Sequence, residues 1–107
     1  MGTLTIESGE TESPNLRETV ALEFVRGYTF IAPETLTGTV KVETSYKRDP
    51  TADDWTTVML AGVDFVIPAG KTVMLPDLMC KSLRLVSSAA EAADRGIGVI
   101  GHTSLPG

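Results

Sequence analysis

The sequence predicts an all-β protein: a single antiparallel β-sandwich, with a jelly roll as one arrangement, and one short helical turn near residues 88–94. Apolar and polar residues alternate in several runs, as expected where one face of a strand is buried. Turns rich in Gly or Pro recur about every eight to twelve residues, a spacing typical of sandwiches and barrels. The 107 residues, 42% of them hydrophobic, suffice for one core but not for two.

The clearest strand lies in "TGTVKVETSY", residues 37–46. Val40, Val42, Thr44 and Tyr46 alternate there with Lys41, Glu43 and Ser45, which predicts one buried and one solvated face. Further strands are predicted in "ETVALEFV" (18–25), "YTFIAP" (28–33), "WTTVML" (55–60), "VDFVIP" (63–68), "KTVMLP" (71–76), "KSLRLVSS" (81–88) and "GIGVIG" (96–101). The whole chain therefore reads as strands joined by short turns.

Three segments are expected along the chain. Residues 1–15 form a flexible N-terminal arm or a short strand, because 7–15 are polar, acidic and rich in turn formers. Residues 16–101 form the β-sandwich domain, and residues 102–107 a C-terminal tail. The one helical turn is predicted in "SSAAEAAD", where Ser88 and Glu91 have the spacing of a capping box.

Charge and composition exclude several classes of partner. The net charge is −5 and the nine Lys and Arg residues are scattered, so no nucleic-acid partner is expected. No signal peptide and no run of about eighteen apolar residues occurs, so no membrane partner is expected. Cys80, the only cysteine, cannot form an intramolecular disulfide, so packing has to hold the fold together.

The sequence argues against catalysis, and it predicts no catalytic residue, no cofactor and no metal. His102, the only histidine, is expected in an exposed tail, away from any nucleophile, and Cys80 is expected to be a small buried hydrophobe. One Cys and one His are too few for structural zinc. Asp49, Asp53, Asp54 and Asp64 could supply oxygen ligands for calcium, but their spacing is not that of an EF-hand. A small enzyme remains a third alternative.

The segment "YKRDPTADDWTTV", residues 46–58, concentrates the chain's side-chain chemistry. Its turn-forming residues predict a solvated hairpin loop between two strands. Trp55 either covers the edge of the core or contacts a ligand or another protein. The candidate interface or ligand residues are Tyr46, Asp49, Asp53, Asp54 and Trp55.

Three segments, "FIAPETLTGTVKVETSYKRDPTADDWTTV", "VIPAGKTVML" and "LRLVSSAAEAADRGIGVIG", resemble the small β-sandwich structural proteins of tailed bacteriophages. The shared features are a Leu-Thr-Gly turn, an acidic loop before a Trp and an Ile-Pro-Ala-Gly turn. The resemblance implies a non-enzymatic virion protein: a capsid decoration, minor capsid or tail-associated subunit that binds a symmetric protein lattice. It also implies a virion location, host cytoplasm during assembly, other virion proteins as partners, and a homo-oligomer, trimeric or higher.

The alternative belongs to another class of protein. A carbohydrate-binding β-sandwich would show the same strand pattern and could use the loop from Tyr46 to Trp55 to stack on a sugar ring.

Overall fold

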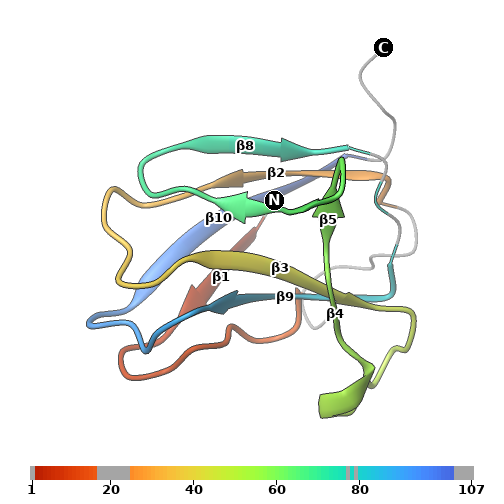
Figure 1. The fold of residues 1–107 in the computed structure, drawn as a ribbon, viewed down its shortest axis with the longest axis horizontal. Coiled ribbons are helices and arrows are strands. Elements are labelled where there is room, and N and C mark those ends of the chain that lie inside the picture. The colour runs from red at the N-terminus through yellow and green to blue at the C-terminus, as the bar shows by residue number, and fades with distance from the viewer. Residues whose placement is uncertain (1, 17–24, 77, 79, 103–107) are drawn as a thin grey trace.

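The computed structural model describes residues 2–16, 25–76, 78 and 80–102, and the regular secondary structure of this part of the chain is almost entirely β-strand (Figure 1). The strands are β1 (Gly2–Ile6), β2 (Gly27–Ile31), β3 (Val40–Ser45), β4 (Thr56–Thr57), β5 (Met59–Leu60), β6 (Val63–Asp64), β7 (Val66–Ile67), β8 (Thr72–Leu75), β9 (Ser82–Ser87) and β10 (Arg95–His102). A 3-10 helix, η3 (Ala52–Asp54), lies between β3 and β4, and Leu16 also has the 3-10 conformation. The predicted all-β class is confirmed.

The strands form two main antiparallel sheets and a small hairpin. The first sheet has the order β1-β10-β2-β8. In the second sheet β3 pairs with β4, β7 and β9, while β5 and β6 pair only with each other. Side chains from both main sheets contribute to one core, and the sandwich and jelly-roll arrangements stay predictions.

The predicted alternation is confirmed in the first part of β3, from Val40 to Glu43, but it is wrong at the end of the strand, where Ser45 is buried and Thr44 only half-buried. Val40 and Val42 are buried, and they pair with Ser87 and Leu85 of β9, so the apolar sides of both strands face the core. Tyr46 does not continue this pattern. It lies one residue past the end of β3 and its side chain is 82% exposed, so its predicted place on the buried face is wrong.

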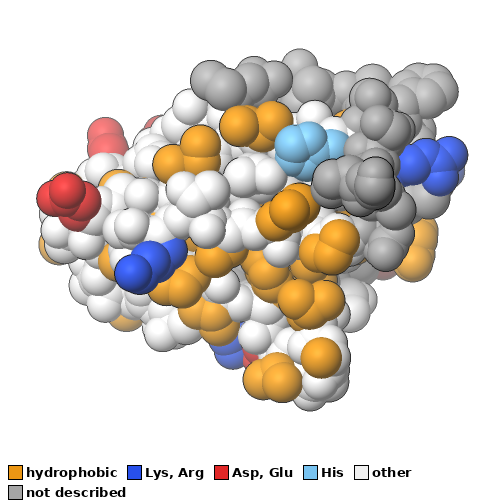
Figure 2. All heavy atoms as spheres, turned by 90° about the horizontal axis from the view of Figure 1, so that it is seen from above, with side chains coloured by type: hydrophobic (Ala, Val, Ile, Leu, Met, Phe, Trp, Pro, Cys, Tyr) orange, Lys and Arg blue, Asp and Glu red, His pale blue; other side chains and the backbone are white. Residues whose placement is uncertain are grey.

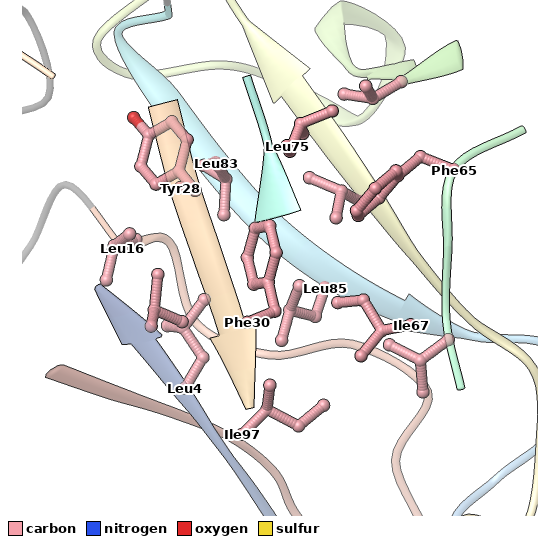
Figure 3. Close-up of a cluster of buried hydrophobic side chains, with 14 of the residues drawn as sticks. Leu4, Leu16, Tyr28, Phe30, Phe65, Ile67, Leu75, Leu83, Leu85 and Ile97 are labelled. Atoms are coloured by element: carbon pink, nitrogen blue, oxygen red, sulfur yellow. The ribbon is translucent and has the colours of Figure 1, made fainter. Parts of the chain in front are cut away.

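The core is centred on aromatic residues of the first sheet (Figure 3). The ring of Phe30 lies 6.1 Å from that of Tyr28 and 6.0 Å from that of Phe65, distances at which aromatic rings attract one another. Around them pack apolar side chains from both sheets, among them Leu4, Ile97, Leu83, Leu85, Ile67 and Leu75. Cys80 is a free cysteine and is buried in this core, as predicted.

The N-terminal segment is part of the fold rather than a separate arm. Gly2–Ile6 form β1 along the edge of the first sheet. Farther on, Glu12 forms a β-bridge with Val86, and Leu16 is buried in the core. Of the two predicted alternatives, the strand describes residues 2–6. The predicted strand at 18–25 lies, except for Val25, outside the described residues, as do residues 103–107 of the predicted tail.

The helical turn predicted near residues 88–94 does not form. The backbone N–H of Glu91 donates to the carbonyl of Glu10 at 3.0 Å, and the carbonyl of Glu91 accepts from the N–H of Gly9 at 2.8 Å. Ser88 Oγ accepts from the N–H of Thr39 instead of capping a helix. Since these partners occupy the backbone groups that a helix would use, the segment runs as an irregular connection.

Candidate functional site

Glu91 is the carboxylate most strongly perturbed by its surroundings. Its buried side chain accepts hydrogen bonds from the N–H groups of Thr37 (2.8 Å) and Gly38 (2.9 Å), from Ser87 Oγ (2.7 Å) and from Arg95 Nε (3.0 Å). Burial alone would raise the pKa of Glu91, but these hydrogen bonds outweigh it and lower the pKa to about 2. Both carboxylate oxygens accept hydrogen bonds from protein groups. Glu91 therefore joins the segment between β9 and β10 to the segment between β2 and β3, rather than acting on a substrate.

The loop between β3 and β4 is a hairpin loop, as predicted, and it is held by its own polar groups. Asp54 Oδ2 accepts from the N–H (2.8 Å) and Oγ1 (3.0 Å) of Thr51, and Lys47 Nζ lies 3.0 Å from Asp54 Oδ1. The hydrogen bond from the Thr51 N–H is the main reason that the pKa of Asp54 is lowered, followed by Lys47. Ser82 Oγ also donates to the carbonyl of Lys47 at 2.7 Å, which ties the loop to β9.

Trp55 lies at the end of this loop, half-buried beneath an arginine of β9. The guanidinium carbon of Arg84 is 4.4 Å from the centre of the indole ring, a cation–π contact. Arg84 also forms ion pairs with Glu43, at 2.7 Å, and with Glu12. Trp55 therefore covers the outer side of the second sheet instead of entering the core.

A shallow pocket of about 360 Å³ opens beside Trp55. Its lining is mostly polar and combines both charge signs with one aromatic ring: Ser13, Asn15, Arg48, Asp49, Pro50, Trp55 and Arg84. Of the five predicted candidates, the structure places only Asp49 and Trp55 in this lining. Asp54 supports the loop, and Tyr46 and Asp53 are exposed on it.

The two residues considered for nucleophilic chemistry have structural contacts. Cys80 is buried, its sulfur lies 3.6 Å from the hydroxyl of Tyr28, and burial raises the pKa of the thiol. His102 is the last residue of β10, and its Nε2 lies 2.8 Å from Thr29 Oγ1. The prediction that His102 lies in an exposed tail is therefore wrong, because β10 extends one residue farther than expected.

Among the described residues, no three His, Cys, Asp or Glu side chains come together in a way that could hold a metal ion.

No helix within the described ranges has the length and apolar character that a membrane span requires.

The β5–β6 hairpin exposes apolar side chains at its tip. Met59, Leu60 and Val63 are 57%, 44% and 66% exposed. The two-residue turn between the strands has positive φ at both Ala61 (55°) and Gly62 (81°), as in a type I′ turn. In Figure 1 the hairpin rises in front of the sheets to the level of β8. We refer to residues 59–63 as the apolar tip.

The outer side of the first sheet carries no charge among the described residues. Its outward-facing residues are those that alternate with the core residues, and none of them is Asp, Glu, Lys or Arg: Thr3, Thr5, Thr29, Ile31, Thr72, Met74, Gly96, Gly98, Ile100 and His102. We call these ten residues the uncharged face. Figure 2, the view from above, shows the pale blue histidine with hydrophobic side chains near it, while the Lys, Arg, Asp and Glu side chains visible in this view lie farther from the histidine.

The outer side of the second sheet is different in character. It carries the ion pairs of Arg84 with Glu43 and Glu12, and Lys41 lies 2.7 Å from Asp64. One side of the molecule is thus suited to water, and the other is neutral. The alternation of apolar and polar residues predicts each strand separately. It does not show that the four strands whose outward residues lack charge belong to one sheet.

No protein-family model matches this chain, and no curated protein or solved structure is similar enough to count as a match.

Proposed function

We propose that this protein is a non-enzymatic assembly subunit, a capsid decoration or minor capsid or tail-associated protein of a virion that attaches to a lattice of other virion proteins. The virion setting comes from the sequence resemblance to phage structural proteins. The observation that carries the assembly role is the apolar tip. Leu60 and Val63 pair across the hairpin and are both exposed, Met59 is exposed beside them in the sequence, and exposed apolar surface of this kind supports a role in interaction.

The hairpin is built to present its tip. At its base the N–H of Phe65 donates to the carbonyl of Val58 at 2.9 Å, and both of these side chains are buried. The Lys41–Asp64 ion pair ties β6 to β3. A hairpin anchored in this way offers apolar side chains in a fixed arrangement, which lowers the entropy cost of binding.

The energy available from the tip is appreciable. Burying the exposed parts of Met59, Leu60 and Val63 contributes about 1 kcal/mol each, because complete burial of such side chains is worth about 1.5–3 kcal/mol. The three together correspond to roughly a hundredfold in affinity. This is enough to position a subunit that also gains from many identical sites on a lattice.

The test is attachment of the tagged protein to purified virions of the phage that encodes it. We expect the wild-type protein to sediment with the particles, and Val63→Asp to bind at least about tenfold more weakly because a carboxylate would be desolvated in the contact. Lys71→Asp, in an exposed turn away from the hairpin, is the matched control and should bind nearly as the wild type. Wild-type protein that never sediments with the particles, or equal binding by Val63→Asp, would refute the proposal.

A second candidate function is carbohydrate binding at the pocket beside Trp55. The pocket favours it by joining an indole ring to polar side chains, a combination that suits sugars. The Arg84 guanidinium already occupies one face of the ring, which counts against stacking there. Glycan binding that is lost in Trp55→Ala, with an unchanged circular dichroism spectrum, would support this function over attachment to a lattice.

A further inference from the structure

We infer that the uncharged face is where a second copy of this chain docks, sheet against sheet about a two-fold axis. This contact is separate from the apolar tip and does not depend on the proposed attachment to a lattice. The inference rests on how charge is distributed over the two outer sides of the molecule.

A two-fold contact joins the same surface of both copies, so charges of one sign near the axis meet their own copies. The chain carries a net charge of −5, and two copies repel each other over most approaches. The uncharged face avoids this cost because none of its side chains is Asp, Glu, Lys or Arg. A basic or acidic partner would find no complementary charge there, whereas an identical neutral face fits.

The relief of the face also suits contact between sheets. Gly96 and Gly98 lie beneath neighbouring side chains: a Cβ on Gly96 would lie 3.3 Å from Thr3 Cγ2, and one on Gly98 would lie 3.4 Å from Ile31 Cβ. The glycine row therefore lets Thr3 and Ile31 lie over the middle of the sheet. Ile31 and Met74 remain 42% and 48% exposed, and their apolar surface is available for burial.

The dimensions predict a weak contact. Four strands spaced about 4.8 Å apart, each about five residues long at about 3.3 Å per residue, give a plane of roughly 300 Å². A standard interface buries about 800 Å² on each partner, so this association is expected to be weak and to need a high protein concentration. Such a contact would be strengthened wherever copies are already held close together.

The experiment is sedimentation velocity of the full chain over a wide range of concentrations. Thr72→Lys adds a charge to the uncharged face without removing apolar area, and Met74→Lys does both. Thr56→Lys is the matched control, because Thr56 is also exposed on an edge strand but belongs to the other sheet. Circular dichroism and urea unfolding establish that each variant is folded, and both positions are exposed.

We expect the wild type to form dimers as the concentration rises, and Thr72→Lys and Met74→Lys to raise the dissociation constant at least about tenfold. Thr56→Lys should associate as the wild type does. A wild type that stays monomeric up to about 1 mM, which is a standard free energy near −4 kcal/mol, would overturn the inference. Association that is undiminished in both face variants, or diminished equally in Thr56→Lys, would also overturn it. None of these results bears on particle attachment through the apolar tip.

Discussion

Replacing Glu91 by Gln should destabilise the fold by about 3 kcal/mol at pH 7. The carboxylate accepts from four donors, and it does so with its side chain out of solvent. An amide offers one acceptor oxygen in place of two and turns an NH₂ group toward N–H donors. A hydrogen bond to a charged group is worth about 1.5–3 kcal/mol, and an unpaired buried donor costs about 1–3 kcal/mol. Urea unfolding at pH 7, followed by circular dichroism, measures the difference.

The pH dependence makes this prediction specific to the carboxylate. Folding lowers the pKa of Glu91 from 4.5 to about 2, so the protonated group is disfavoured in the folded state. The resulting stability is complete above pH 4.5 and is lost as the pH falls toward 2. At about 1.4 kcal/mol per pKa unit, the advantage of the wild type over Glu91→Gln should shrink by about 2 kcal/mol between pH 7 and pH 3.

Glu34→Gln is the matched control for Glu91→Gln. Glu34 is exposed, and substitutions at such surface positions usually change stability by less than about 0.5 kcal/mol. The reasoning about Glu91 would be refuted if Glu91→Gln were as stable as Glu34→Gln at pH 7. A large difference at pH 7 that did not change down to pH 3 would also refute it, because the loss would then not come from the charge.

Two further outcomes are expected. Deleting residues 1–6 removes β1 with the buried Leu4 and Ile6. The deletion should abolish two-state unfolding or lower the thermal midpoint by more than 10 °C, which corresponds to a loss of stability of roughly 2 kcal/mol or more. An intact transition at the wild-type temperature would show that the first sheet does not need this strand. Ala61→Gly should raise the free energy of unfolding, measured in urea, by about 0.5–1 kcal/mol. An alanine at positive φ is strained by about 1–2 kcal/mol, and glycine removes this strain. Part of the gain is cancelled because glycine loses more backbone entropy on folding than alanine does. A destabilised Ala61→Gly would mean that the turn does not limit stability.

Much of the fold could be predicted from local patterns. Alternation places Val40, Val42, Leu83 and Leu85 toward the core, and Gly62 marks a turn that the structure contains. Tyr46 continues the same alternation in the sequence, but β3 ends before it, at Ser45. Periodicity has no information about where hydrogen bonding to a neighbouring strand stops.

The sites depend on partners far apart in the chain, and these escape local reasoning. The segment containing Glu91 is rich in alanine and predicts a helix, yet its carboxylate binds N–H groups more than fifty residues earlier. The sequence indicates Trp55 as the distinctive residue of its loop. No residue near it in the sequence indicates that the guanidinium of Arg84 lies over its ring. The uncharged face becomes visible only when the strand order is known.

The pairing of β1 with β10 also has a consequence for how the protein folds. Gly2 pairs with Val99, so the first sheet cannot close until nearly the whole described chain is available. Contacts this distant in sequence slow folding, because a long loop must be ordered before they form. During synthesis, β1 has to wait without its partner strand while ribosomes add the intervening residues. The segment "GTLTI" is free of charge, so until β10 has been made this strand is open to pairing with other chains.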